Sequence, residues 1–204
     1  MSKRLNRDDI DKMHDYGLYV PTRTIYMGSE EVDMEIGESG TDAAMAERVI
    51  KNLHILDNAA SEPITIIMNN LGGYVFHGMA IYDAIKKCRS HITIIGTGQV
   101  MSMGSLILQA ADKRVLTPSA VMMIHHGYDH HDNHIKTIRN WVKFGEKFDE
   151  ILNDIYFKKI KEKNSDFNRK KLDKLLDFDT ILLASEAVSL GLADEIEEYQ
   201  TQTS

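Results

Sequence analysis

Residues 91–125 read HITIIGTGQVMSMGSLILQAADKRVLTPSAVMMIH, and this stretch decides the fold. It begins with the β-branched run 92–95, which is typical of a buried strand. After a glycine-containing segment, Ser102 opens an apolar run that predicts a helix. A second short strand, 120–124, leads to His125. The pattern therefore predicts a serine at a strand-to-helix turn and a histidine at the end of the next buried strand.

This placement suits an activated hydroxyl group at Ser102. Unpaired N–H groups and the positive end of the helix dipole lie at a helix N-terminus, where they stabilise a developing oxyanion. His125 is the type of base that such a nucleophile needs. Gly104 lets the helix pack closely behind the turn. A serine that only caps the helix is the alternative interpretation, and Ser105 is interpreted as a packing residue of the same helix.

The composition is that of a globular protein that buries one core. The chain has 204 residues, of which 43% are hydrophobic and 27% are charged. Its formal net charge of −7 argues against nucleic acid as a partner, because a large basic excess is needed to neutralise phosphates. No apolar run is long enough to span a bilayer, so no membrane association is expected.

Cys88 is the only cysteine, which excludes an internal disulfide and favours a reducing compartment. Its helical pattern indicates a small core residue. The charged N-terminus lacks the apolar segment of a signal peptide, so we expect a cytoplasmic protein. Residues 1–17 are expected to form a flexible arm, 18–198 a single domain, and 199–204 a loose tail.

Strands and helices alternate along the domain, which predicts an α/β fold with a mostly parallel sheet. Functional groups of such sheets gather at the carboxyl ends of the strands. The acidic segment 29–40 alternates apolar and charged residues, as an exposed edge strand does. Strands are expected at 24–27, 64–68, 92–95, 114–116 and 120–124, and helices at 41–56, 75–87 and 102–112.

A long helix is predicted over about 133–162, where apolar residues recur every three or four positions. Such a helix rarely packs wholly on its own small domain, so we expect a projecting arm that meets another subunit. A short helix at 169–176, a helix opened by Ser185 and a last short strand complete the domain.

Several motifs together resemble the proteolytic subunit of the Clp protease, a serine peptidase family with the crotonase-like fold. The matching segments are 24–28 (TIYMG), 72–73 (GG), 78–85 (GMAIYDAI), 102–105 (SMGS), 121–125 (VMMIH), 179–188 (DTILLASEAV) and 191–196 (GLADEI). The likeness covers roughly residues 20–198 in the same order. It implies a crotonase-like βαβ superhelix with a projecting handle helix.

The resemblance also implies the roles of the site residues. Ser102 would be the nucleophile, His125 the general base and Asp179 the group that orients His125. The backbone N–H groups of Gly73 and Met103 would form the oxyanion hole. No metal and no other cofactor would be required. Independently, a glycine pair after a buried strand allows close approach of a ligand to the backbone.

Assembly into seven-membered rings, stacked face to face through the long helix, is a further implication of the resemblance. An ATP-driven unfolding ring of the AAA+ type would feed peptides or unfolded proteins into the inner chamber. The apolar stripe of the long helix is what such stacking requires.

The chain departs from the family pattern around the substrate groove, which we expect to include Gly72, Asn70, Leu71 and His126. Asn70-Leu71 replaces the usual Ser-Pro before the glycine pair, and loss of the proline is expected to loosen this loop. After His125, the usual Gln-Pro and glycine-rich strand are replaced by HGYDHHDNH. Substrate pairing and ring stacking are therefore less firmly implied than the triad.

Alternatives remain at several positions. Asp177 lies two residues before Asp179 and competes with it as the partner of His125. The histidines between 125 and 134 form either a solvated loop or a metal or pH-sensitive cluster, in which His130 and His134 would share a helix face. At the level of function, the rivals are a proteolytically silent ring subunit and an acyl-CoA hydratase or isomerase, for which no carboxylate flanks the glycine pair.

Overall fold

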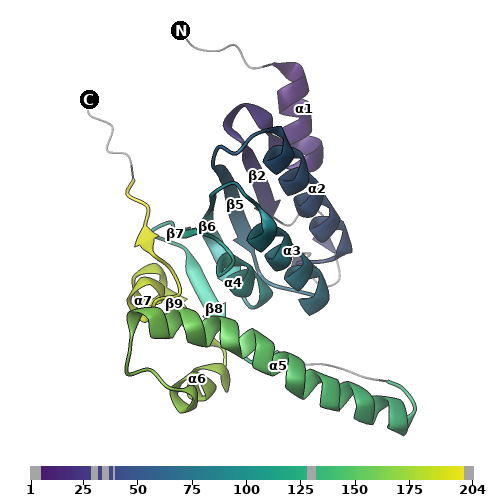
Figure 1. The fold of residues 1–204 in the computed structure, drawn as a ribbon, viewed down its shortest axis with the longest axis vertical. Coiled ribbons are helices and arrows are strands. Elements are labelled where there is room, and N and C mark those ends of the chain that lie inside the picture. Colours follow the sequence, from purple (N-terminus) through teal and green to yellow (C-terminus); the bar gives the residue numbers. More distant parts are fainter. Residues whose placement is uncertain (1–5, 29–31, 34–36, 39, 128–131, 200–204) are drawn as a thin grey trace.

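A mainly parallel sheet with helices packed against it accounts for the alternating pattern of the sequence (Figure 1). The computed structural model describes residues 6–28, 32–33, 37–38, 40–127 and 132–199. The helices are α1 (Arg7–Tyr16), α2 (Ala43–Ala59), α3 (Val75–Lys87), α4 (Met103–Leu108), α5 (Ile135–Lys163), α6 (Arg169–Leu176) and α7 (Ala184–Leu190). The strands are β1 (Leu18–Tyr19), β2 (Thr24–Gly28), β3 (Val32–Asp33), β4 (Gly37–Glu38), β5 (Ile64–Asn70), β6 (Ile92–Met101), β7 (Lys113–Leu116), β8 (Val121–Ile124), β9 (Thr180–Leu183) and β10 (Glu195–Ile196).

The main sheet has the order β1-β2-β5-β6-β7-β10, and β8 and β9 extend it from β6. Its pairs are parallel except β1 with β2 and β8 with β9. The apolar runs of β5 and β6 lie side by side, with Ile64 opposite Ile92 and Ile66 opposite Ile94. These four side chains are at most 1% exposed, as expected for central strands covered on both faces. The predicted mixed α/β class with a mainly parallel sheet is confirmed.

Strand β6 is longer than predicted and changes partner along its length. Residues 93–96 pair with β7, whereas 99–101 pair with β8. The change occurs around Gly98, whose φ of +54° is favourable for glycine. The side chain of Asn69 accepts a hydrogen bond from the Gln99 N–H at 3.0 Å and holds this bend. The glycine segment therefore continues the strand to Met101, because both of its neighbours still supply backbone partners.

Helix boundaries mostly follow the sequence signals. Helix α3 has the predicted bounds, and the side chain of Asp42 caps α2 by accepting from the Met45 N–H. Helix α4 ends at Leu108, four residues earlier than expected, since a turn is needed before β7. Strand β9 was not predicted, because Ile181 and Leu183 are exposed and only pairing with β8 defines the strand.

Within the predicted flexible arm 1–17, residues 7–16 form the helix α1. Asn6 caps its start, and Gly17 ends it in the left-handed conformation with φ +61°. Asn52 of α2 donates a hydrogen bond to the Tyr16 carbonyl at 2.7 Å and ties the end of the helix to the domain. In the acidic segment, β3 pairs antiparallel with β4 in a separate sheet. Met34 and Ile36, part of the predicted edge strand, lie outside the described residues.

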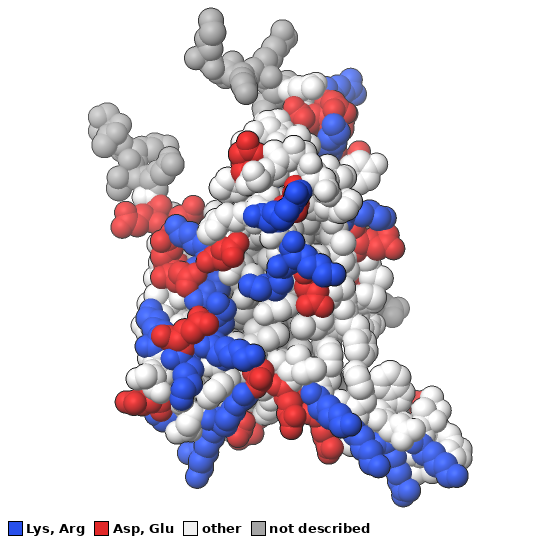
Figure 2. All heavy atoms as spheres, viewed as in Figure 1, with Lys and Arg blue, Asp and Glu red and all other residues white. Residues whose placement is uncertain are grey.

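Helix α5 confirms the predicted long helix and divides into two parts. Its C-terminal part packs on the domain through the buried side chains of Leu152, Tyr156 and Ile160. Its N-terminal part projects from the domain (Figure 1) and leaves Trp141 and Val142 about half exposed. Figure 2 shows basic side chains along the lower edge of the molecule, over α5 and α6. Among the described residues, no helix is both long and apolar enough to cross a membrane.

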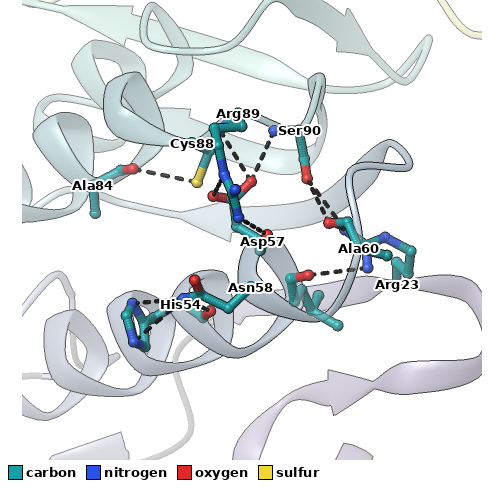
Figure 3. Close-up of polar contacts among 10 residues, drawn as sticks. Arg23, His54, Asp57, Asn58, Ala60, Ala84, Cys88, Arg89 and Ser90 are labelled. Atoms are coloured by element: carbon teal, nitrogen blue, oxygen red, sulfur yellow. Dashed lines mark hydrogen bonds and ion pairs between the residues drawn. The ribbon is translucent and has the colours of Figure 1, made fainter.

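A polar network secures the edge of the sheet opposite the carboxyl ends of its strands (Figure 3). The guanidinium group of Arg23 donates to the carbonyls of Leu56 and Ala60 at 3.0 Å, closing the end of α2. The carboxylate of Asp57 accepts hydrogen bonds from the backbone N–H groups of Ser90 and Arg89, and these bonds lower the pKa of Asp57. Burial raises the pKa of the Cys88 thiol to about 11, so this half-buried cysteine is an unreactive packing residue.

The ion pair of Asp194 with Arg114 joins the last loop to β7, and it generates a stability prediction. Partial burial acts to raise the pKa of Asp194, but hydrogen bonds from Arg114 outweigh it and the pKa lies below its ordinary value. The stabilisation is therefore complete at neutral pH and is lost as the pH falls through this lowered pKa. Asp194→Asn should reduce the free energy of unfolding by about 1.5–3 kcal/mol at pH 7, because the Arg114 guanidinium is buried.

Urea unfolding of wild type and Asp194→Asn at pH 7 and at pH 3 checks this expectation. The difference between the two proteins should shrink at pH 3. Glu195→Gln is the matched control, since its ion pair with Lys113 is about half exposed and should change stability by less than about 1 kcal/mol. An equal effect of both variants would contradict the assignment.

Candidate active site

Ser102 follows β6 directly and occupies the N-cap position of α4. Its backbone has φ 49° and ψ −121°, an unusual conformation for a residue with a side chain. The side chain makes no capping hydrogen bond. Instead, its Oγ lies 2.8 Å from Nε2 of His125. The interpretation of Ser102 as a simple helix cap is therefore wrong, because the hydroxyl group points to the histidine.

The sheet brings His125 and Asp179 to the same point. Strand β8 runs parallel to the end of β6, and the Ser102 N–H donates to the Met123 carbonyl at 2.8 Å, which places His125 beside the serine. Strand β9 runs antiparallel to β8, so the residue before it lies beside His125. Nδ1 of His125 is 2.9 Å from Oδ1 of Asp179. An Nδ1–H that donates to the carboxylate leaves Nε2 free to accept the serine proton.

Exposure differs sharply between His125 and Asp179. The His125 side chain is 16% exposed, whereas that of Asp179 is 67% exposed in the single chain. The competing Asp177 forms the C-cap of α6, where its N–H donates to the Asp173 carbonyl at 2.9 Å. The contact with His125 thus involves Asp179, and its carboxylate faces solvent in the isolated subunit.

The glycine pair lies against the serine turn. Gly72 has φ +106° and is so close that an added Cβ would lie 2.6 Å from the Ser102 Cβ and 3.1 Å from the Met103 nitrogen. Gly73 has φ +140° and forms a parallel bridge with Thr41. This bridge uses the Gly72 carbonyl and the Tyr74 N–H. The loop is therefore packed against both the nucleophile position and the first residue of α4.

The environment of Asn70 differs from two expectations: that this residue lines the substrate groove, and that loss of the proline loosens the loop. It is 1% exposed, so its side chain lies beneath the loop and is not available to a substrate. Its Oδ1 accepts the Gly72 N–H at 2.8 Å and the Thr41 hydroxyl at 3.1 Å. A Cβ on Gly104 would lie 2.8 Å from the same Oδ1, which confirms that glycine allows close packing there. The asparagine thus holds the loop in the absence of the proline.

Leu71 and His126, the other expected groove residues, are half-buried. The backbone N–H of His126 donates to the Leu176 carbonyl at 2.8 Å, which fixes the chain after His125 to the end of α6. Of the replaced stretch that follows, residues 128–131 lie outside the described part of the chain.

Two features near the site were missed in the sequence. Ser105, interpreted as a packing residue, is fully buried, but its Oγ lies 2.6 Å from the hydroxyl group of Tyr156 on α5. Phe76, four residues after Gly72, packs against two phenylalanines of α5, Phe144 and Phe148, with ring centroids 6.1 and 5.5 Å away. The only sequence signal for the contact between Ser105 and Tyr156 was the presence of a tyrosine in the apolar stripe of α5.

The metal hypothesis for the histidine cluster gains no support from the residues that can be examined. Among the described residues, no group of three or more histidine, cysteine or acidic side chains could hold a metal ion. His134 is the N-cap of α5, and its Nδ1 accepts from the Lys136 N–H at 3.3 Å. His130 and His131 lie outside the described residues.

A serine, a histidine and an aspartate in hydrogen-bond contact, beside a glycine loop and a helix N-terminus, define the class of serine hydrolases. The Clp protease family model matches residues 24–200. An ATP-dependent Clp protease proteolytic subunit of Deinococcus radiodurans is 31% identical over 158 residues, covering 76% of this chain and 75% of the relative. A second such subunit, from Pseudomonas aeruginosa, is 32% identical over 163 residues, covering 77% of each chain. The chain belongs to the Clp protease family, and the predicted family, its crotonase-like fold and its serine protease class are confirmed.

The contact between Gly72 and Ser102 generates a prediction for the site. Gly72→Ala would place a methyl group against the serine side chain and the Met103 nitrogen, at a φ that disfavours a side chain. We expect peptidase activity to fall by about 100-fold or more, as when an oxyanion donor is removed. Peptide hydrolysis, thermal unfolding and native mass should be measured together. Wild-type activity in a folded, assembled variant would contradict this account.

Proposed function

We propose that Ser102, His125 and Asp179 form the catalytic triad of a serine endopeptidase. The observation that carries the proposal is the continuous contact from Ser102 Oγ to His125 Nε2 at 2.8 Å and from His125 Nδ1 to Asp179 Oδ1 at 2.9 Å. The strained backbone of Ser102 supports a functional role, because such conformations gather at active sites.

In the first half-reaction, Ser102 Oγ attacks the peptide carbonyl carbon while His125 Nε2 takes the serine proton. The tetrahedral intermediate collapses, the C–N bond breaks, and His125 gives the proton to the leaving amine. Water then attacks the acyl-enzyme, His125 accepts its proton, and the released serine oxygen regains a proton from His125. Asp179 holds the imidazole in the required tautomer and stabilises its charged form. No metal and no other cofactor takes part in these steps.

The N–H groups of Gly73 and Met103 are the proposed oxyanion hole. Met103 is the first residue of α4, so its N–H has no acceptor within the helix. The parallel bridge to Thr41 uses groups on either side of Gly73, which supports an outward direction for the Gly73 N–H. The contact of Gly72 with Ser102 and Met103 supports one shared site for both donors.

The proposed substrates are peptides or unfolded proteins. Gly73, Tyr74 and Phe76 are exposed and follow the glycine that packs against Ser102, and the aromatic contacts of Phe76 with α5 would offer an apolar wall for substrate side chains. The relatives are named as ATP-dependent proteolytic subunits, which supports an AAA+ ATPase unfoldase as partner. We also propose a cytoplasmic location, because the only cysteine of the chain is an unreactive thiol.

Assembly into seven-membered rings, stacked in pairs through α5, completes the proposed function. The projecting part of α5 exposes large apolar side chains, including Ile135, Trp141 and Val142, which a second subunit would cover. Ile181 and Leu183 on β9 are also more than half exposed. Cover over this strand would shield the neighbouring Asp179, which is 67% exposed in the single chain.

Intact mass after treatment with a fluorophosphonate tests the nucleophile. Wild type should gain one adduct per chain, and Ser102→Ala should gain none. Ser185→Ala is the matched control, since Ser185 is an exposed serine at the start of α7 and its loss should leave the adduct unchanged.

No adduct on an intact wild-type ring would overturn the peptidase proposal in favour of a proteolytically silent ring subunit. Stoichiometric binding of an acyl-CoA with no adduct would favour the hydratase or isomerase class instead.

A second experiment tests the role of α5 in assembly. Ile138→Asp with Val142→Asp should give species smaller than the wild-type assembly and at least about 10-fold less active, because a buried unpaired charge opposes association. Native mass spectrometry and peptide hydrolysis provide the readouts. Asn140→Asp is the matched control, because this exposed residue lies on the other side of the helix. Full activity of the double variant as a monomer would contradict the proposal.

A further inference from the structure

Tyr156 brings a hydroxyl group into the buried contact between α5 and the nucleophile turn. It is 2% exposed, and its neighbours one turn away on the helix, Leu152 and Ile160, are apolar. Burial raises the pKa of Tyr156 well above its ordinary value, although the hydrogen bond with Ser105 acts in the opposite direction. The phenol is therefore a neutral donor at physiological pH. Such a buried hydroxyl group needs a partner, and it finds one at the active site.

The hydrogen bonds around this hydroxyl group have one consistent direction. Ser105 Oγ lies 2.7 Å from the carbonyl oxygen of Ser102, which only accepts, so the Ser105 hydroxyl donates to it. Because that proton is used, Tyr156 donates to Ser105 Oγ across the 2.6 Å contact. Its oxygen also lies 3.4 Å from the Ser102 carbonyl oxygen. A chain of hydroxyl groups therefore runs from α5 to this one carbonyl.

The Ser102 carbonyl belongs to the same peptide unit as the Met103 N–H. A trans peptide is planar and rigid, so the direction of its C=O fixes the opposite direction of its N–H. Ser102 combines a positive φ of 49° with a ψ of −121°, and rotation of this peptide, which changes ψ of Ser102, is the simplest way to relieve the strain. Hydrogen bonds to the carbonyl oppose that rotation. They also polarise the peptide, which strengthens its N–H as a donor.

We propose that Tyr156 and Ser105 are positioning residues for the oxyanion hole: they hold the Ser102–Met103 peptide so that the Met103 N–H faces the developing oxyanion. The inference rests on the proposed roles of Ser102 and Met103. It adds a function for two buried residues that touch neither the substrate nor His125 in the mechanism above.

The position of Tyr156 also connects this peptide to the assembly surface. Val142 lies 14 residues before Tyr156 on the same helix, which corresponds to about 21 Å along the axis. The helix is continuous between them. A subunit that binds the projecting part of α5 therefore fixes the same rigid element that donates to the nucleophile turn.

Two variants, Tyr156→Phe and Ser105→Ala, test the inference when each is assayed with a peptide of the proposed substrate class. Both variants should lower kcat for a fluorogenic peptide by about 10-fold or more, a part of the 10²–10³ that loss of a whole oxyanion donor costs. KM should stay within about 2-fold, because ground-state contacts are unchanged. The kcat of the double variant should be no lower than that of the less active single variant, since the two hydroxyl groups act in one chain. Tyr82→Phe, a half-buried tyrosine of α3 outside the site, should match wild type.

Inhibitor affinity distinguishes a specific effect on the oxyanion hole from a general loss of active-site structure. A peptide aldehyde forms a hemiacetal whose oxygen occupies the oxyanion hole, so its affinity should fall by the same factor as kcat/KM. The corresponding peptide acid, a product, should bind as it does to wild type. The pH dependence of kcat/KM should keep its midpoint, because His125 is not altered. All assays use the assembled fraction, identified by native mass, and Ser105→Ala provides the test if Tyr156→Phe does not assemble.

Wild-type kcat and aldehyde affinity in the variants would overturn this inference alone. A loss of kcat with unchanged aldehyde affinity would also overturn it, because the effect would then lie outside the oxyanion hole. Failure of wild type itself to react with a fluorophosphonate would instead overturn the proposed peptidase function, and this inference with it.

Discussion

The strained turn at Ser102 is the constraint on which the rest of the structure depends. A residue with a side chain at φ 49° is held there only by its surroundings. Strand β6 fixes the chain before it, the Met123 carbonyl accepts the Ser102 N–H, and the first turn of α4 together with Ser105 fixes its carbonyl. The hydroxyl group is thereby turned away from the helix end and toward His125. Every other part of the site is arranged around that direction.

The loop before α3 illustrates how one departure from the family pattern is compensated. A proline would restrict this backbone directly. Here Asn70 restrains it through its buried side chain, which accepts from Gly72 and Thr41 and fills the space beside Gly104. The loop is thus held by a hydrogen-bonded side chain in place of a ring. The physical requirement, a fixed glycine pair against the serine turn, is met by different chemistry.

The single subunit leaves parts of its site and surface uncovered. Asp179 is 67% exposed, so its electrostatic effect on His125 is weakened by solvent in the isolated chain. Nearby, Ile181 and Leu183 are exposed, and the projecting part of α5 also exposes apolar area of the kind that an interaction surface covers. Both observations support the proposed assembly, in which neighbouring subunits would cover Asp179 and the exposed apolar surface.

The sequence by itself determined the α/β class, the central strands, α3, the long helix, and the positions of Ser102, His125 and Asp179 in matching motifs. The fold elements, Ser102 and His125 depend on local periodicity and on residue types at strand ends, which a single chain displays, whereas Asp179 was implied only by the resemblance to the family. The tertiary structure decided which residues meet. It extended β6 past its glycines, formed β9 by pairing with β8, folded residues 7–16 into a helix, and placed Asn70 under the loop. It also joined Tyr156 to Ser105, 51 positions apart, since contacts between distant residues depend on packing that no local pattern contains.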